Sequence, residues 1–214
     1  MTNAIDLVPV QPRTPDLWET IIGRRSVRAF STQSIPRELI ERAIEAAGWA
    51  PSPHGSQPWR FVVVESKERR YALADAMAAT WRNQLTMDRQ DLAELERRLA
   101  RSMERLQRAP ILVLVCLYME DTQDYPDPDR QAAEQTMAVQ SLGAATQNLL
   151  LSLHQQGLDA GWMCAPLFCP DVVRDVLGLG VDHQPHALIP VGRAAADPKR
   201  RPRRPISTII SDWQ

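Results

Sequence analysis

The sequence predicts one domain of the α+β or α/β class, on three observations. Two apolar runs, Trp59–Val64 and Ile111–Leu117, have the length of strands, and the first is rich in β-branched and aromatic residues. The most strongly helical segment, residues 131–156, carries apolar residues nearly all round, which predicts burial on several sides. No repeat and no linker divides the 214 residues, a length that suits one sizeable domain. Helices that precede and separate four or five strands are typical of this class.

Capping residues define the two helices expected before the first strand. Residues 1–13 read as a loose arm, outside a single domain that spans 14–214. Residues 14–16, Thr-Pro-Asp, then supply an N-cap, a first-turn proline and a first-turn acid for a helix that ends near Gly23. Residues 34–36 open a second helix, whose apolar positions follow the helical period and which Gly48 is placed to end.

Further elements follow between the two long strands and after them. Residues 66–107 have a helical pattern that we expect to break near 85–88. Two short strands are expected at residues 160–163 and 187–191. Between them a helix begins at Pro170, where proline suits a first turn.

Composition argues against several classes of function. The net charge of −1 gives no reason to expect a nucleic-acid partner. No apolar run approaches the roughly 20 residues that span a bilayer, so no membrane partner is expected. The N-terminus does not resemble an export signal. The three cysteines are too few for a disulfide framework, which fits a cytoplasmic protein. Cys164 and Cys169 are isolated, and His183 and His186 lack acidic or thiolate neighbours, so no metal site is expected.

A cationic segment follows the first helix and is the most informative local signal. Arg24, Arg25, Ser26 and Arg28 place three guanidiniums and a hydroxyl within five residues. Because the planar guanidinium donates in pairs to phosphate oxygens, this pattern suits a phosphate site. Cations also gather at the negative end of a helix dipole, and taken alone the segment fits that common surface role at least as well.

Two further segments point to a planar, phosphate-bearing ligand. The proline-rich loop Ala50–Pro58 carries Ser, His and Gln and can present fixed donors and acceptors to a ring, or simply connect a helix to a strand. The tail from about 194 to 214 is first basic and then apolar. Six cations in residues 193–204 can contact nucleic acid. The proline spacing and the apolar end instead favour a tail that packs on the protein and directs one or two of its arginines at a bound phosphate.

These segments occur together in a family pattern. The stretches IIGRRSVRAF, IPRELIERAIEAAGWAPSPHGSQPWRFVVVE, GAATQNLLLSLHQQGLDAGWM and VGR…RRPRRP resemble the FMN-dependent nitroreductase superfamily from Trp18 to the end, about nine-tenths of the chain. The resemblance implies a three-layer α/β/α sandwich with a mostly antiparallel sheet. It also implies an intertwined homodimer, in which both subunits build each FMN pocket and the tail can pack on the partner.

The resemblance also assigns cofactor residues by position. The residues that would bind the FMN phosphate, ribityl chain and pyrimidine edge are Arg24, Arg25, Ser26 and Arg28. The ring is lined from the other subunit by Pro51, Ser52, Pro53, His54 and Gln57. The segment along the isoalloxazine near its N5 atom is Met163, Cys164, Ala165, Pro166 and Leu167. The tail arginine that best matches a phosphate ligand is Arg203, with Arg200, Arg201 and Arg204 as close competitors.

A closer resemblance bears on the substrate. The phrases APSPH…QPWRFV, DAMAATWR, DYPDPDRQAAEQTM, GAATQNLL and FCPDVVRDVLGL are similar to the C-terminal FMN domain of the actinobacterial γ-glutamyl ligase that completes the deazaflavin coenzyme. Pro53 and His54 stand where many nitroreductases have glycine and asparagine. His54 is the preferred substrate-facing residue. Weaker candidates for the pocket rim are Trp81, Arg82, Tyr125, Arg130 and Glu134, although Trp81 suits a core and Tyr125 a turn equally well.

The expected function is therefore an FMN-dependent oxidoreductase. FMN would pass a hydride from its N5 atom to a small aromatic or deazaflavin-like acceptor, which includes a dehydro precursor of the deazaflavin coenzyme. NAD(P)H or a reduced deazaflavin would supply the electrons in ping-pong exchange, without a side-chain nucleophile. One alternative is a broad NAD(P)H-dependent nitro or quinone reductase. Another is a protein that binds flavin or deazaflavin without turnover.

Overall fold

The computed structural model describes residues 16–87, 91–198 and 201–213. Its helices are α1 (Leu17–Gly23), α2 (Arg37–Gly48), α3 (Lys67–Met87), α4 (Leu92–Arg108), α5 (Pro128–Gln155) and α6 (Pro170–Leu177). Its strands are β1 (Trp59–Val64), β2 (Ile111–Leu117), β3 (Asp159–Ala160) and β4 (Gln184–Gly192). Short 3-10 turns are η1 (Pro53–Gly55), η2 (Ala165–Phe168) and η3 (Ile206–Thr208).

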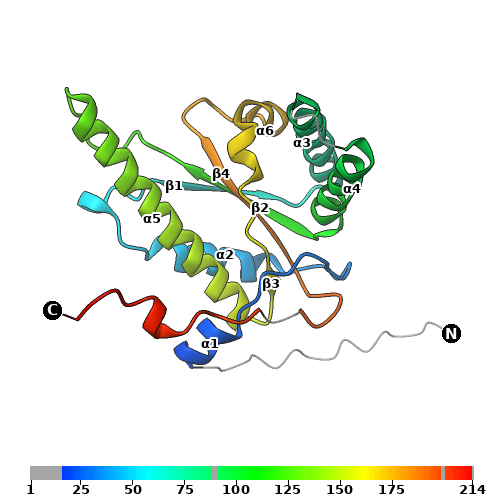
Figure 1. The fold of residues 1–214 in the computed structure, drawn as a ribbon, viewed down its shortest axis with the longest axis horizontal. Helices are drawn as coiled ribbons and strands as arrows, with labels where there is room; N and C mark the ends of the chain where they lie inside the picture. Colours follow the sequence, from blue (N-terminus) through cyan, green and yellow to red (C-terminus); the bar gives the residue numbers. More distant parts are fainter. Residues whose placement is uncertain (1–15, 88–90, 199–200, 214) are drawn as a thin grey trace.

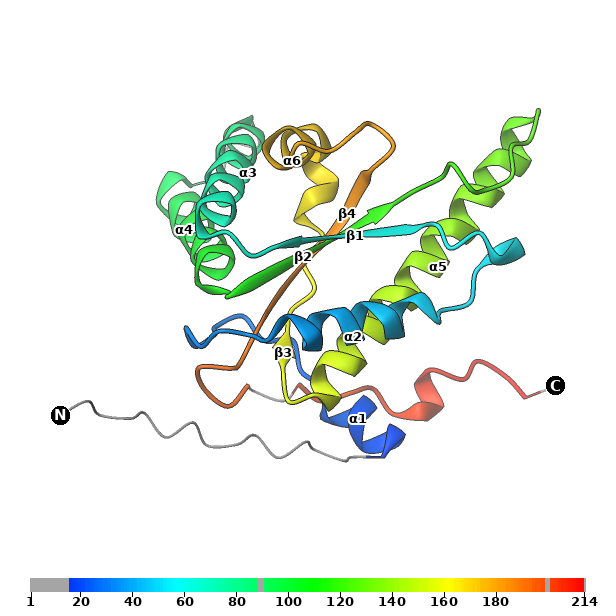
Figure 2. The same ribbon diagram turned by 180° about the vertical axis from the view of Figure 1, so that it is seen from behind.

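The strands form one sheet in the order β1-β2-β4-β3, with every neighbouring pair antiparallel. Helices α2 and α5 lie on one side of this sheet, and α3, α4 and α6 lie on the other (Figures 1 and 2). The predicted α+β class, three-layer sandwich and antiparallel sheet are confirmed.

Strand β2 shows how the sequence builds two cores at once. All seven of its residues are buried. Because successive side chains of a strand point to opposite faces, Val113 and Val115 join the core beneath α2 and α5, whereas Leu112 and Leu114 join the core beneath α3 and α6. A continuous apolar run is the pattern expected of a strand covered on both faces.

The long helix α5 is buried along only part of its length. Its C-terminal half packs against α2 and the sheet, and Ala145, Leu149 and Leu153 are fully buried there. Its N-terminal half begins at Pro128, three residues before the predicted start at 131, and leaves Val139 39% exposed. The predicted burial on several sides therefore holds within this chain for the C-terminal half only.

Two sequence-based boundaries are corrected. Asp16 is the N-cap of α1 and not its first-turn acid, because its carboxylate accepts a hydrogen bond from the Glu19 backbone N–H at 2.7 Å. Thr14, Pro15 and the arm at 1–13 lie outside the described residues. The strand expected at 160–163 is wrong in extent, since β3 ends at Ala160 and Met163 forms only an isolated bridge to Leu188.

Other boundaries agree with the sequence. The break expected in the long helical region is confirmed, because α3 ends at Met87 and α4 begins at Leu92. The strand expected at 187–191 lies inside the longer β4. No helix in the described ranges has both the length and the apolarity needed to cross a bilayer.

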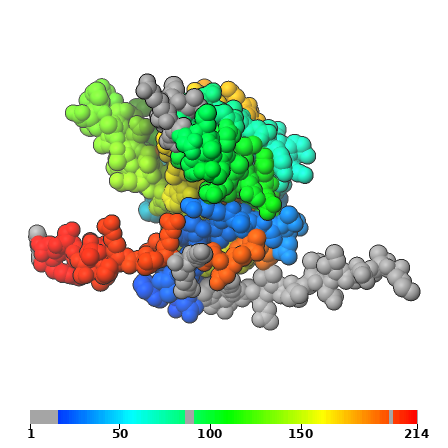
Figure 3. Space-filling view, turned by 45° about the vertical axis from the view of Figure 1, so that its right-hand side comes forward, coloured from blue at the N-terminus to red at the C-terminus, as the bar shows by residue number. Residues whose placement is uncertain are grey.

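The C-terminal tail projects from the molecule. Residues 201–213 pass α1 and run away from the rest of the chain, as the red segment of Figure 3 shows. Ile206, Ile209 and Trp213 are 72%, 67% and 85% exposed. The apolar end of the tail therefore does not pack down on its own protomer.

Candidate functional site

The cationic segment after α1 is held as an extended strand against β3. The Val27 backbone N–H donates to the Ala160 carbonyl at 2.9 Å, and Ser26 forms a parallel bridge to Ala160. Val27 is buried, whereas Ser26 and Arg28 on either side of it are exposed. This alternation, which extended backbone imposes, turns the hydroxyl and the guanidinium to the outer side of the segment.

A glycine permits that close approach. A Cβ atom on Gly161 would lie 2.6 Å from the carbonyl oxygen of Val27, closer than van der Waals contact allows. On the next stretch of the same segment, the Ser31 backbone N–H donates to the Arg193 carbonyl at 2.8 Å. The start of the tail is thus paired with the cationic segment, which brings arginines from both ends of the chain together.

These arginines line a hollow of about 480 Å³, here called the cationic hollow. Its side chains include Arg24, Arg25, Ser26, Arg28, Asp197, Arg201 and Arg203. Burial first, and then the positive charges of Arg203 and Arg25, lower the pKa of the Arg24 guanidinium. The Nε atom of Arg24 is buried without a hydrogen-bond partner. Within the described ranges no carboxylate forms an ion pair with Arg24, Arg28 or Arg203. Converging, unpaired guanidiniums of this kind fit a phosphate.

Arg25 has a different role from its neighbours. Its guanidinium donates to the carbonyl oxygens of Ile22 at 2.5 Å and of Arg24 at 2.7 Å. It therefore caps the C-terminal end of α1, where backbone carbonyls lack helical partners. The reading of this segment as cations at a helix end is correct for Arg25, which also borders the cationic hollow.

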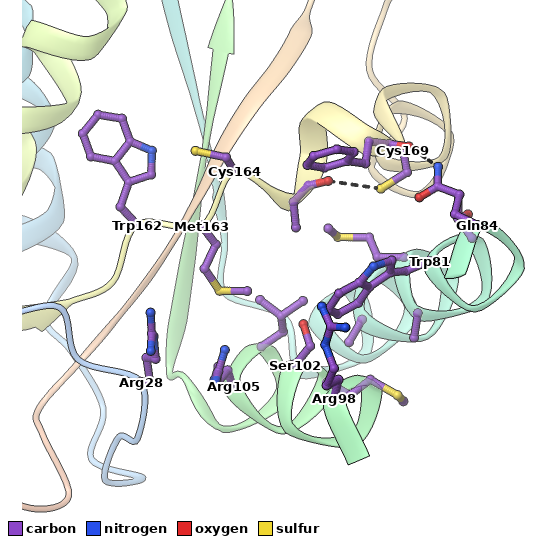
Figure 4. Close-up of a pocket in the computed structure, with 18 residues that line it drawn as sticks. Arg28, Trp81, Gln84, Arg98, Ser102, Arg105, Trp162, Met163, Cys164 and Cys169 are labelled. Atoms are coloured by element: carbon purple, nitrogen blue, oxygen red, sulfur yellow. Dashed lines mark hydrogen bonds between the residues drawn. The ribbon is translucent and has the colours of Figure 1, made fainter. Parts of the chain in front are cut away.

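A second space, the aromatic cavity, adjoins the first. Its volume is about 500 Å³, and Arg28 lines both spaces. The largest apolar side chains that line it are Met77, Trp81, Met103, Trp162, Met163 and Phe168 (Figure 4). Cys164 and Ala165 also line it, so three residues of the predicted ring-facing segment meet there. Pro166 is buried in η2, and Leu167 is exposed and outside the lining.

The proline-rich loop lies far from both spaces of its own chain. Its turn η1 is on the opposite side of the molecule from α3 and α4 (Figures 1 and 2), and no residue of 51–57 lines either space. The loop is nevertheless ordered, because the Gln57 backbone N–H donates to Ser52 Oγ at 3.1 Å. His54 and Gln57 have φ angles of 54° and 47°. Such left-handed backbone in non-glycine residues is strained and concentrates at functional sites.

The predicted substrate residues are scattered. Trp81 lines the aromatic cavity. Arg82 is exposed and bonds Glu96 at 2.8 Å and 3.0 Å, outside the lining. Arg130 lies over the Tyr125 ring near the start of α5, 5.1 Å from its centroid, and neither residue lines either space. Glu134 is 1% exposed and accepts from the Gln123 backbone N–H.

Several cavity residues were missed by the sequence reading. Helix α4 contributes Arg98, Ser102 and Arg105 to the lining. They recur at helical spacing beside the buried stripe of Leu95, Leu99 and Leu106, which is the border position from which a polar side chain reaches a cavity. This spacing can be read from the sequence. That Arg105 and Arg28 line the same cavity is a result of tertiary folding, which no local pattern encodes.

Residues 21–193 match the family model described as the nitroreductase family. The chain belongs to this family. No group of three or more His, Cys, Asp or Glu side chains that could hold a metal occurs among the residues the structure describes.

Two curated relatives extend the comparison. Mouse iodotyrosine deiodinase 1 is 28% identical over 86% of the chain, which spans 64% of that protein's length. The Bacillus subtilis protein YfhC, named as a candidate NAD(P)H nitroreductase, is 27% identical over 89% of the chain and 90% of its own length.

Solved structures share the fold. A BluB-like flavoprotein from Clostridium difficile superposes with a TM-score of 0.80 at 25% identity, covering 94% of this chain and 100% of that one. A candidate nitroreductase from Desulfovibrio desulfuricans, solved in complex with FMN, superposes with a TM-score of 0.72 at 24% identity, covering 94% and 99%.

Proposed function

We propose that this nitroreductase-family chain binds FMN between two copies of itself and passes hydride from a donor to a small aromatic acceptor. As a member of the family, the chain is an FMN-dependent oxidoreductase. The observation that carries the binding site is the cationic hollow, where Arg24 and Arg203 converge without an ion-pairing carboxylate in the described part of the chain. Bound FMN supplies the redox chemistry, since flavin N5 accepts and donates hydride.

Different residues of the chain would bind different parts of the cofactor. Arg24, Ser26 and Arg203 hold the phosphate in the cationic hollow. Arg28, which lines both spaces, reaches the pyrimidine edge, where a cation stabilises the negative charge of the reduced ring. Met163, Cys164 and Ala165 border the ring in the aromatic cavity.

A second copy of the chain would complete this site. The ordered loop at 51–57 faces neither space of its own protomer, so its role in ring binding requires a partner. Exposed apolar side chains on α1, the end of α2 and the tail would be buried in such a dimer; they include Leu17, Trp18, Trp49, Ile206, Ile209 and Trp213. In the dimer, His54 would face the acceptor, and Tyr125 and Arg130 would stand at the rim.

The names of two relatives indicate which donor and acceptor the chain would use. The YfhC relative is named for NAD(P)H and nitro compounds, which favours NAD(P)H as donor. Mouse iodotyrosine deiodinase is named for an iodinated phenol, which supports a single aromatic ring as acceptor. Reduction of a deazaflavin precursor rests only on the sequence resemblance to the ligase domain, and a reduced deazaflavin donor has the same basis.

Purified protein tests the proposal directly. We expect a yellow protein that releases FMN, and not FAD, on denaturation, and light scattering that gives two chains per particle. NAD(P)H should bleach the flavin, and an aromatic acceptor should restore its colour, which distinguishes an enzyme from a flavin carrier. Protein that stays colourless and monomeric after incubation with FMN would refute the proposal.

A further inference from the structure

Three arginines give the aromatic cavity a positively charged edge. Arg28 comes from the extended segment after α1, and Arg98 and Arg105 come from α4. Figure 4 shows them along one side of the cavity, with the indole rings of Trp81 and Trp162 at its opposite ends. The described residues that line the cavity include no carboxylate. Arg98 already lies over the Trp81 ring, 5.6 Å from its centroid. Arg28 and Arg105 lose part of their hydration beside an apolar chamber, so their charges are stabilised when an anion binds.

Arg105 is the most informative of the three. It is half-buried and forms no ion pair with a carboxylate of the described ranges. Burial first, and then the positive charges of Arg28 and Arg101, lower its pKa. The carboxylates of α4 form other ion pairs, namely Glu94–Arg97, Glu96–Arg82 and Glu104–Arg108. Arg105 therefore faces the cavity with its charge uncompensated.

The position of Arg105 separates it from the cofactor residues. Arg28 belongs to the segment that the proposed function assigns to FMN. Arg105 belongs to α4, which carries none of the residues assigned to FMN. It lies across the cavity from Met163 and Cys164 (Figure 4). Ser102 lies one helical turn before Arg105 and lines the same wall, where its hydroxyl adds a hydrogen-bond donor.

We propose that the aromatic cavity selects an acceptor whose aromatic ring carries an anionic oxygen group, a carboxylate or a phosphate, and that Arg105 binds this group. The ring would pack against Trp81 and Met103, while the planar guanidinium donates to two oxygens of the anion. This inference rests on the proposed function, because it takes the cavity to be the place where the acceptor meets FMN.

Equilibrium binding tests the charge preference without turnover. Benzoate and benzamide have nearly the same shape and differ in charge, and neither is reduced by a flavin. We expect FMN-loaded protein to bind benzoate about ten-fold more tightly than benzamide, as a charge-assisted contact predicts. Tryptophan fluorescence can follow binding because two indoles line the cavity. Equal affinity of the unmodified protein for the two ligands would overturn the proposal without any variant.

Two variants of α4 locate the preference. Arg105→Gln should remove most of the benzoate preference, whereas Arg101→Gln should keep it, because Arg101 is exposed on the same helix and does not line the cavity. A preference that survives in Arg105→Gln would refute the assignment. Loss of FMN from Arg105→Gln would also refute it, since Arg105 would then belong to the cofactor site.

Turnover distinguishes an anionic acceptor from an anionic donor. A hydride and one proton convert a nitro group to a nitroso group and water, so 4-nitrobenzoate and 4-nitrobenzamide can be compared in reoxidising dithionite-reduced protein. The rate ratio should favour the carboxylate and fall about ten-fold in Arg105→Gln. If only reduction by NADPH slows in this variant, the arginine serves the donor and the proposal is wrong. If neither nitro compound reoxidises the flavin, the proposed function is wrong, and the inference that rests on it is wrong as well.

Discussion

Arg24 and Arg203 face the same hollow, and the positive charge of Arg203 is one of the forces that lower the pKa of Arg24, after burial itself. The charge of Arg203 therefore disfavours the charged guanidinium of Arg24 until an anion lies between them. A phosphate satisfies both. Because this anion compensates buried charge, the cofactor that carries it should stabilise the fold as well as supply chemistry.

The first prediction concerns Arg24→Ala. FMN affinity should fall about ten-fold to a hundred-fold, the range of a charge-assisted hydrogen bond of about 1.5–3 kcal/mol. FMN-free protein should be no less stable than its parent, because a buried and unpaired Nε has been removed. Flavin titration and thermal denaturation measure the two effects. Arg42→Ala, which removes an exposed guanidinium from α2, is the control and should change neither quantity.

The second prediction compares two adjacent tail arginines. Arg203 lines the cationic hollow and Arg204 does not, so Arg203→Ala should weaken FMN binding by about ten-fold or more while Arg204→Ala has little effect. Flavin titration of both variants decides between them. A larger loss in Arg204→Ala would show that the wrong tail arginine is assigned to the phosphate.

The third prediction concerns the contact between the cationic segment and β3. In Gly161→Ala the new methyl group would lie 2.6 Å from the Val27 carbonyl oxygen, so the segment must shift and carry Ser26 and Arg28 with it. We expect weaker FMN binding and a loss of stability of about 1–3 kcal/mol. Gly48→Ala is the matched control, because a Cβ there meets nothing within 4 Å. Unchanged FMN affinity in Gly161→Ala would contradict the assigned role of this segment.

The fourth prediction concerns the three thiols. Cys164 is exposed, whereas Cys116 and Cys169 are buried, and burial raises the pKa of Cys116 to about 12. Because the thiol ionises more easily in the unfolded chain, Cys116 contributes to the stability of the fold. This contribution is complete below about pH 9 and is lost as the pH rises toward 12. At pH 8 one thiol per FMN-free chain should react rapidly with a disulfide reagent, and three after denaturation. Rapid reaction of two or more native thiols would show that the buried pair is accessible.

Local patterns encode most of the fold. The uninterrupted apolar run of β2 predicts a strand covered on both faces, and the alternation of its side chains between two cores accounts for every one of its residues. The start of α1 was placed at the wrong N-cap, because two residues near it can cap a helix. Asp16 and Thr14 are both good N-caps, and the reciprocal bond between Asp16 and Glu19 decides for Asp16.

The site was predictable only where it is continuous in sequence. Arg24, Ser26 and Arg28 could be grouped because they lie within five residues. The different role of Arg25 could not be predicted, since the carbonyls that Arg25 caps become available only when α1 ends at Gly23. The contribution of Arg105 depends on tertiary folding, which brings α4 and Arg28 to the same cavity from distant parts of the sequence.

The shared flavin site is tested most directly by mixing two defective chains. One chain carries Arg24→Ala and Arg203→Ala. The other carries His54→Gly and Gln57→Gly, changes that remove two loop side chains at positive φ angles, which glycine adopts without strain. Each chain alone should be inactive with NAD(P)H and a nitroaromatic acceptor.

Co-expressed in equal amounts, the two chains should recover about a quarter of the parental activity, because half of randomly formed dimers contain one intact site of two. The measurement is NAD(P)H oxidation per chain in the co-expressed protein. Recovery near a quarter would establish that each flavin is held by the cationic hollow of one chain and the loop of the other. No recovery, in dimers shown by mass to contain both chains, would contradict it.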